Sequence, residues 1–216
     1  QRPQCGDHVV DVAAHAQVDH QQHQRGQHER TDVTMSQPKP DAAGARYAVL
    51  VIDMQNGVLA DCTGADTVVP KINAVVDKAR EADIPVIWVQ DSSYLQPGED
   101  EYEITPALNP RPEDRRIDKK YRDSFEGTEL ADELERLGVG NLVVCGAQTD
   151  FCVLSTCSGA FVRGYGVTLV SDGHLTADQT ERGKPAPDTI VNFVNMYCRG
   201  MRAPGRCGSA IRAGEV

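Results

Sequence analysis

The chain has 216 residues, with 22 Lys and Arg against 32 Asp and Glu and a formal net charge of −10. This length fits one domain of ordinary size with a substantial core. An acidic chain without a basic stripe argues against a nucleic-acid partner. No apolar run reaches the length that spans a membrane, and no segment has the pattern of a secretory signal peptide, so we expect no membrane partner.

The N-terminal residues 1–45 have weak apolar periodicity, and we expect a disordered tail or a leader added in expression. Five of the six histidines lie in this segment: His8, His15, His20, His23 and His28. Metal binding is the alternative, but their spacing lacks ligand pairs in a folded context. We expect the folded domain to cover 46–200 and the basic, Gly-rich residues 201–216 to form a C-terminal tail.

After residue 45 the chain alternates strand patterns with helical patterns. Residues 47–53 are continuously apolar and predict a buried first strand that ends at Asp53. A helix is expected over 70–82, with Pro70 at its start, and a second strand over 84–89. Further strands are expected over 115–120, 142–145 and 166–172, and further helices over 128–137, from Cys152 onward and over 186–198. This alternation predicts an α/β, doubly wound fold, with a mostly parallel sheet and helices on both faces.

The segment 90–114 is a long polar loop, and loops of this length in a compact domain are usually functional. It carries five large apolar side chains: Tyr94, Leu95, Tyr102, Ile104 and Leu108. We expect a neighbouring subunit to cover them, in a homodimer or higher homo-oligomer. A lid that folds back on its own domain is the alternative.

Seven cysteines are scattered along the chain without a Cys-X-X-Cys pair: Cys5, Cys62, Cys145, Cys152, Cys157, Cys198 and Cys207. The spacing suggests neither a zinc ribbon nor a thioredoxin-type site, and a reducing, cytoplasmic location fits best.

Cys152 ends the most informative stretch, residues 141–152, which predicts a buried strand, a turn through Gly146 and a helix start. Thr149 and Asp150 supply side chains of the N-cap type. Cys152 therefore falls in the first turn of a helix, at the sheet edge where open α/β folds bind ligands. A helix N-terminus favours the thiolate, so this cysteine is a candidate nucleophile. A small buried core residue is the alternative.

Three separated pieces carry a resemblance to a known family. They are Val51-Ile-Asp-Met-Gln-Asn56, Lys119-Lys-Tyr-Arg-Asp-Ser-Phe-Glu-Gly-Thr128 and Gly146-Ala-Gln-Thr-Asp-Phe-Cys-Val153. In this order and spacing, the sequence resembles the isochorismatase-like cysteine hydrolases, which include nicotinamidases and N-carbamoylsarcosine amidases. The resemblance covers about residues 46–200. It implies a Rossmann-like three-layer sandwich, a Cys–Asp–Lys triad and an oligomer.

The resemblance places the triad at Asp53, Lys119 and Cys152. Lys119 is preferred to Lys120 because the family lysine precedes the position of Phe125 by six residues, and strand alternation turns the two lysines to opposite faces. We expect Lys120 to be a solvated charge at a strand end. In this chemistry the Lys ammonium lowers the thiol pKa, and the Asp carboxylate moves the thiol proton to the leaving amine. Attack on a carbonyl then gives a thioester, which water hydrolyses.

The resemblance also implies an oxyanion hole made by the backbone amides of Gln148 and Cys152, with a cis peptide between Ala147 and Gln148. Five further side chains are predicted to contact the substrate: Gln55, Leu59, Trp88, Tyr121 and Phe151.

Two departures from the family pattern bear on function. Nicotinamidases carry a metal site of Asp and His near the second strand, whereas residues 88–93 contain no His and His174 is the only histidine beyond residue 45. We therefore expect no metal, no other cofactor and no cluster of metal ligands in the domain. The second departure is Asp150, which stands where many members have Asn.

Together these patterns predict a metal-independent cysteine hydrolase that cleaves the C–N bond of a small amide or related carbonyl substrate. Two alternatives remain open: hydrolysis of a vinyl ether, as in isochorismatases, and a catalytically idle member that serves as a binding or scaffold module.

Overall fold

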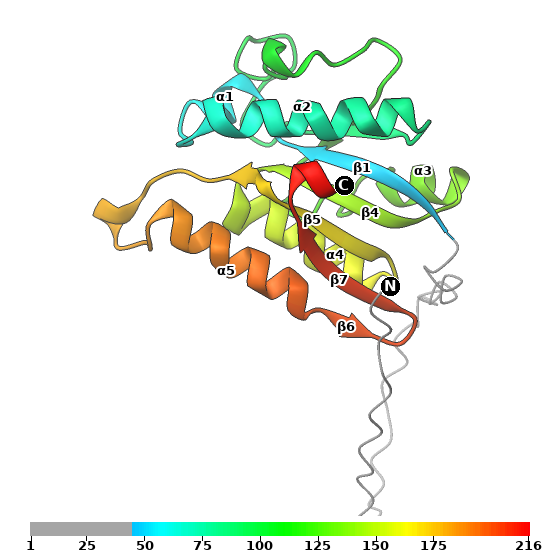
Figure 1. Cartoon of the computed structure of the whole chain (residues 1–216). Coiled ribbons are helices and arrows are strands. Elements are labelled where there is room, and N and C mark those ends of the chain that lie inside the picture. The colour runs from blue at the N-terminus through cyan, green and yellow to red at the C-terminus, as the bar shows by residue number, and fades with distance from the viewer. Residues whose placement is uncertain (1–44) are drawn as a thin grey trace, which may run out of the picture. The chain divides into compact units, whose positions relative to one another are not determined.

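The computed structural model describes residues 45–216, so the predicted N-terminal tail lies, apart from Ala45, outside the described residues. A seven-stranded sheet in the order β3-β2-β1-β4-β5-β7-β6 forms the centre of the fold (Figure 1). Its strands are β1 (Arg46–Ile52), β2 (Val86–Asp91), β3 (Arg115–Lys119), β4 (Val139–Ala147), β5 (Gly166–Leu175), β6 (Arg202–Ala203) and β7 (Arg206–Ile211). Neighbouring strands are parallel except for the β6–β7 pair.

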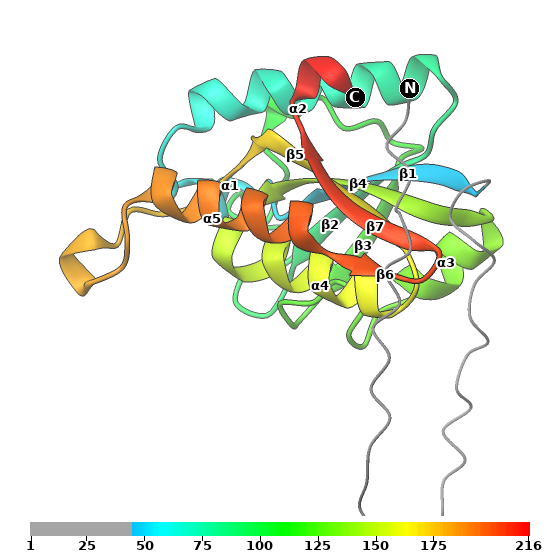
Figure 2. The ribbon, with the colours of Figure 1, turned by 60° about the horizontal axis from the view of Figure 1, so that its bottom comes forward.

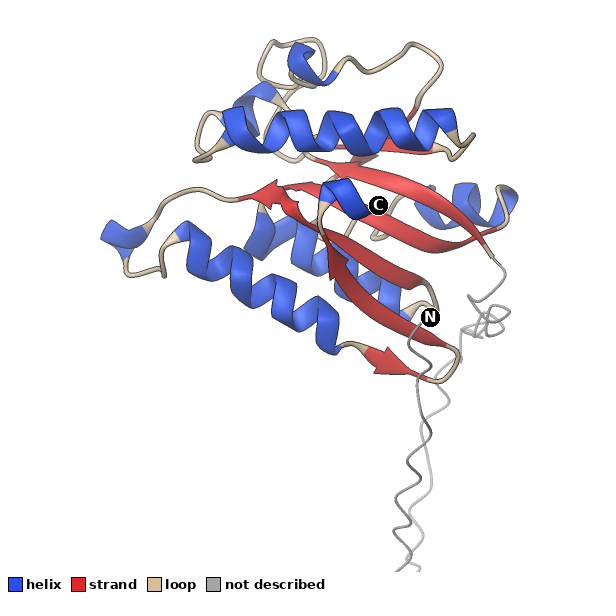
Figure 3. Cartoon of the chain, viewed as in Figure 1, coloured by secondary structure: helices blue, strands red, loops and turns tan. Residues whose placement is uncertain are grey.

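Helices cover both faces of this sheet, as the coloured ribbon makes plain (Figure 3). They are α1 (Asn56–Leu59), α2 (Ala65–Glu81), α3 (Leu130–Arg136), α4 (Leu154–Val162) and α5 (Pro187–Gly200). One hydrophobic core lies between α2 and the sheet, where Ile72 packs with Val51. A second core lies beneath α3, α4 and α5, where Leu134 and Val194 pack with Leu50. The predicted three-layer α/β fold is confirmed.

Several element boundaries differ from the prediction by a few residues, and those of α2 and β2 bear on the core and the site. Helix α2 begins at Ala65, so Pro70 lies inside it, because the buried Val68 and Val69 extend the apolar stripe by one turn. Strand β2 continues past the predicted end at residue 89 to Asp91, and both added residues are buried. The longer β2 carries the Asp91 carboxylate to the sheet edge.

The predicted C-terminal tail over 201–216 is instead part of the fold. Strand β7 pairs in parallel with β5, and β6 closes a short antiparallel hairpin (Figure 2). Gly208 is required there, because an added Cβ would overlap the carbonyl oxygen of Cys198 at the end of α5. The chain then returns to α2, where Lys78 Nζ donates to the backbone oxygens of Gly214 and Val216 at 3.0 and 3.2 Å.

The loop that follows β2 folds back on its own domain, so a neighbouring subunit is not needed to cover it. Four of its five large apolar side chains are buried against the α2 side of the sheet: Leu95, Tyr102, Ile104 and Leu108. Only Tyr94 is exposed, at 62%. The loop argument for an oligomer is therefore wrong, and the lid alternative describes the structure.

No helix within residues 45–216 is long and apolar enough to cross a membrane.

Gly146 lets β1 and β4 approach closely at the edge that carries the site. Its φ is 123°, and an added Cβ would overlap the carbonyl oxygen of Ile52. We expect Gly146→Ala to lower the free energy of unfolding by more than about 3 kcal/mol, since steric overlap and backbone strain act together. Gly200→Ala is the matched control, because a Cβ there meets open space. Urea denaturation measures the free energy of unfolding of both variants. An unfolding midpoint of Gly146→Ala equal to that of the parent protein would contradict the close approach of β1 and β4.

Candidate active site

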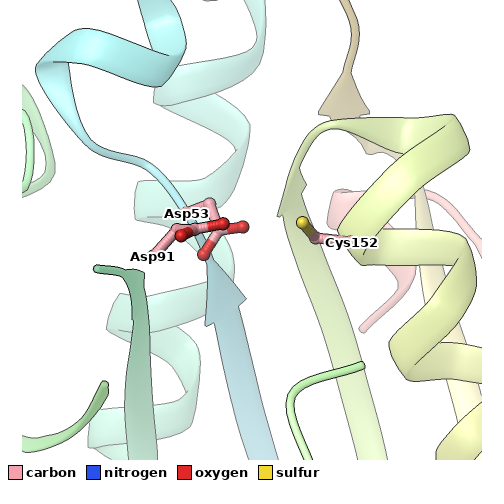
Figure 4. Close-up of side chains that lie close together, drawn as sticks. All are labelled: Asp53, Asp91 and Cys152. Carbon is pink, nitrogen blue, oxygen red and sulfur yellow. The ribbon is translucent and has the colours of Figure 1, made fainter. Parts of the chain in front are cut away.

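The carboxyl ends of four parallel strands bring the predicted triad together. Asp53 follows β1, Lys119 ends β3, and Cys152 lies in a π-helical turn, Thr149–Val153, between β4 and α4. Asp91 ends β2 and joins them. The Cys152 sulfur points toward the two carboxylates (Figure 4).

Lys119 lies at the centre of this cluster, with no exposed side-chain surface. Its Nζ is 2.8 Å from Asp53 Oδ2, 3.2 Å from Asp91 Oδ2 and 3.3 Å from Cys152 Sγ. An ammonium has three N–H donors, so these three contacts use its full capacity. Lys120, the next residue along the chain, is exposed.

Burial governs the protonation of Asp53 more than its ion pair does. Removal from water raises the pKa of Asp53 to about 6, although the Lys119 ammonium acts in the opposite direction. Burial alone would lower the pKa of Lys119. The charges of Asp53 and Cys152 outweigh that effect and raise the pKa above its ordinary value. Lys119 is therefore a fixed cation, whereas Asp53 can take up and release a proton near neutral pH.

Lys119 lowers the thiol pKa of Cys152 as predicted, but the net shift is upward. Burial, together with the charge of Asp53, raises it to about 12, and Lys119 offsets only part of that rise. Cys152 thus carries its proton in the resting protein. Asp53 has a second carboxylate oxygen, Oδ1, that is buried and has no hydrogen-bond partner among the described residues. Since a carboxylate oxygen of Asp53 lies within 4.8 Å of Sγ, this residue is placed to accept the thiol proton.

The prediction that the domain holds no cluster of metal ligands is wrong. Asp53, Asp91 and Cys152 present ligand atoms that all lie within 4.8 Å of one another. However, Lys119 Nζ already contacts all three. An ammonium at that position opposes a second cation by charge, so the donor set fits Lys119 better than a metal ion.

The turn that carries Cys152 is held by polar contacts that replace the predicted N-caps. The peptide between Ala147 and Gln148 is cis, as the resemblance implies. Thr149 Oγ1 lies 2.9 Å from Nδ1 of His174, whose Nε2 lies 3.1 Å from Asn195 Oδ1. Burial lowers the pKa of His174 to about 4, so the ring is neutral at physiological pH and serves as a fixed support.

Asp150 also has a role that an amide would not fill. Its Oδ1 accepts from Thr176 Oγ1 at 2.6 Å, and its Oδ2 pairs with Lys184 Nζ at 2.9 Å. Neither Thr149 nor Asp150, the predicted N-cap residues, caps the following helix through its side chain.

A cavity of about 500 Å³ opens over the thiol. Its lining residues are Asp53, Val58, Asp91, Ser93, Tyr94, Lys120, Tyr121, Arg122, Gln148, Phe151, Cys152 and Gln179. The volume suits a small molecule, and the wall combines aromatic rings with converging polar groups.

Two of the five predicted substrate contacts, Tyr121 and Phe151, line this cavity, and three do not. Gln55 is buried, and its amide bonds both the N–H and the carbonyl of Asp91, which fixes β2 beside β1. Trp88 has no exposed surface, because it packs beneath α2 and donates from Nε1 to Asp114. Leu59 packs against the same core.

Sequence reasoning missed Asp91, although the signal that identified Asp53 applies to it. Both are carboxylates at the end of a buried strand, and the predicted strand stopped two residues short of Asp91. Lining residues from loops gave no such signal: Ser93, Tyr94, Arg122 and Gln179.

Comparison with known proteins agrees with this geometry. A family model described as the isochorismatase domain matches residues 47–186. The chain belongs to the isochorismatase family.

Two curated relatives of this isochorismatase-family protein are named as hydrolases. Streptothricin hydrolase from Streptomyces noursei is 33% identical over 150 residues, which cover 64% of this chain and 59% of that protein. Ureidoacrylate amidohydrolase RutB from Caulobacter vibrioides is 28% identical over 189 residues, covering 68% and 84%. The chain thus spans less than two thirds of streptothricin hydrolase but most of RutB.

Solved structures share the fold. An isochorismatase family protein superposes with a TM-score of 0.69 at 26% identity, covering 76% of this chain and 97% of that one. A cysteine hydrolase from Pseudomonas syringae pv. phaseolicola has a TM-score of 0.70 at 22% identity, covering 79% and 90%.

The central position of Lys119 has a consequence for stability. We expect Lys119→Met to lower the free energy of unfolding by about 3–5 kcal/mol at neutral pH, because it leaves buried carboxylates unpaired. The loss should shrink as the pH falls toward about 6, the pKa of Asp53 in the parent protein, because removal of Lys119 raises that pKa and makes Asp53 neutral at a higher pH in the variant. Lys120→Met is the matched control and should change stability by less than about 0.5 kcal/mol. Equal losses of unfolding free energy in Lys119→Met and Lys120→Met, measured by urea denaturation, would mean that Lys119 does not compensate the charges of the buried carboxylates.

Proposed function

We propose that this isochorismatase-family protein is a cysteine hydrolase that cleaves the C–N bond of a small amide or related carbonyl substrate. Cys152 is the nucleophile, Asp53 the general base and acid, and Lys119 the cation that holds both in place. The observation that carries the proposal is the simultaneous contact of Lys119 Nζ with Asp53 and Cys152, at 2.8 and 3.3 Å, beside a cavity of small-molecule size.

The first step starts from a neutral thiol and an ionised Asp53. As Sγ attacks the substrate carbonyl carbon, the thiol proton passes to Asp53, whose buried Oδ1 has no other hydrogen-bond partner among the described residues. The carbonyl oxygen becomes an oxyanion, for which the backbone amides of Gln148 and Cys152 are the proposed donors. Lys119 keeps its charge throughout and offsets the negative charge that develops near it.

In the second step Asp53 returns this proton to the leaving nitrogen, the C–N bond breaks, and the acyl group remains on Sγ as a thioester. Asp53 is again a carboxylate and takes a proton from the water that attacks the thioester carbonyl. The thiol is then regenerated with release of the acid. A pKa of about 6 suits Asp53 for both directions of transfer.

Asp91 supports this sequence without touching the thiol proton. Its Oδ2 accepts from Lys119 Nζ at 3.2 Å, and its Oδ1 accepts from the backbone N–H of Ser93 at 2.8 Å. The carboxylate is thereby fixed and holds the ammonium between Asp53 and Sγ.

The relatives and the geometry support acyl chemistry over the two alternatives. Streptothricin hydrolase and ureidoacrylate amidohydrolase are named for hydrolytic reactions. Hydrolysis of a vinyl ether needs a proton donor but no thiol at the cavity wall. An idle binding module needs no buried ammonium shared between a thiol and two carboxylates.

The test is ammonia release from a panel of small primary amides and ureido compounds. We expect Cys152→Ala to lower kcat/KM by at least about 10³-fold with the fold intact, because removal of a nucleophile leaves only binding and oxyanion stabilisation. Cys207→Ala, which removes an exposed thiol that does not line the cavity, is the matched control. For the parent protein, kcat/KM should rise with pH through about 6, as Asp53 becomes the carboxylate that accepts the proton. Residual hydrolysis by Cys152→Ala within tenfold of the parent would remove Cys152 from the mechanism.

A further inference from the structure

Two cations line the cavity without any part in the proposed reaction. Lys120 and Arg122 follow β3 directly, and both are exposed to solvent at the cavity wall. The prediction that Lys120 is merely a solvated charge at a strand end is therefore incomplete, because its side chain borders the space above Cys152.

Neither cation forms an ion pair within residues 45–216. Other described cations do: Lys71 with Asp172, Arg80 with Asp114, Arg163 with Asp123 and Lys184 with Asp150. Arg122 is nonetheless held in place, because its guanidinium carbon lies 4.3 Å from the centroid of the Phe151 ring. Lys184 Nζ lies 4.1 Å from the same centroid, but its charge is already matched by Asp150.

The charges around the cavity leave a positive surplus. The two lining carboxylates, Asp53 and Asp91, are both bound to Lys119. Lys120 and Arg122 add two further positive charges at the wall. Counted with the buried Lys119, which does not itself line the cavity, they make three cations against two carboxylates. A cleft with low-dielectric walls concentrates such a field and attracts the opposite charge.

We propose that Lys120 and Arg122 form a carboxylate-binding subsite, so that the substrates preferred by the proposed hydrolase are small amides that also carry a free carboxylate group. One carboxylate neutralises the surplus of one charge, whereas a dianionic phosphate would exceed it. Arg offers paired donors that match the two carboxylate oxygens, and Lys adds a point charge on a flexible stem. The reaction assigned to these substrates rests on the proposed function, but the subsite itself does not.

The subsite is tested with two alkylating reagents of nearly equal size, iodoacetate and iodoacetamide, which differ in charge. Their rates of reaction at Cys152 are measured by mass spectrometry of the peptide, at fixed pH and ionic strength. The exposed thiol of Cys207, which does not line the cavity, is the internal reference. We expect the ratio of the iodoacetate rate to the iodoacetamide rate to be about tenfold higher at Cys152 than at Cys207, as electrostatic complementarity accelerates encounter.

Variants assign the effect to residues. The double variant Lys120→Gln and Arg122→Gln should bring the ratio at Cys152 down to that at Cys207. Arg122→Lys keeps the positive charge, so it should retain most of the increase in the ratio at Cys152. Arg136→Gln is the matched control, because it removes an exposed cation on α3 that does not line the cavity. Each single Gln variant is measured as well, so that a folding defect in the double variant does not decide the outcome.

A ratio at Cys152 equal to that at Cys207, or one unchanged in the Gln variants, would overturn the subsite. An equal fall with Arg136→Gln would also overturn it, because net charge alone would then explain the effect. Alkylation requires no turnover, so this outcome is separate from the hydrolase proposal. A raised ratio at Cys152 without hydrolysis of any amide would support the subsite and contradict the proposed hydrolase activity. Hydrolysis without a preference for amides that carry a carboxylate, together with equal ratios at Cys152 and Cys207, would support the hydrolase activity and contradict the subsite.

Discussion

One buried ammonium organises the site. Lys119 Nζ donates to two carboxylates and a thiol that come from three other segments of the chain, at distances of 2.8 to 3.3 Å. A lysine without exposed surface requires such compensation, because an unpaired charge inside a protein costs several kcal/mol. The ends of β1, β2 and β3 and the turn after β4 are thus held in one arrangement by a single cation. The close approach at Gly146 lets the β4 end take its place in that arrangement.

Burial also decides where the proton rests. Desolvation penalises every charged form in the cluster, but Lys119 keeps its charge because three partners surround it. Of the two remaining titratable groups in the proposed triad, Asp53 titrates close to neutral pH, with a pKa of about 6. Burial raises the pKa of the Cys152 thiol to about 12. The proposed site therefore stores a neutral nucleophile beside a base, and formation of the thiolate is linked to attack on substrate.

The sequence predicts the fold well because strand and helix patterns are local, and it predicts Asp53 and Cys152 because strand ends meet at one edge. The sequence pattern does not identify Asp91, because the apolar run that predicts β2 ends two residues before it. The predicted effect of Lys119 on the thiol pKa of Cys152 is present, but burial outweighs it. Adjacency to Lys119 can be inferred from a motif, whereas the extent of burial cannot. The glycine-rich C-terminus suggested a tail, whereas Gly208 serves close packing on α5. The homo-oligomer and the cytoplasmic location stay predictions.

The central claim, a protonated Cys152 beside an ionised Asp53, is tested most directly by the ultraviolet absorbance of the thiolate. The difference spectrum between the parent protein and Cys152→Ala isolates this thiol from the other cysteines. We expect no thiolate signal from Cys152 between neutral pH and about pH 9, above the ordinary cysteine pKa of about 8.5, because burial holds the thiol in its protonated form. A full thiolate signal at neutral pH would contradict the account, since Lys119 would then stabilise an ion pair with sulfur and Asp53 would have no thiol proton to accept.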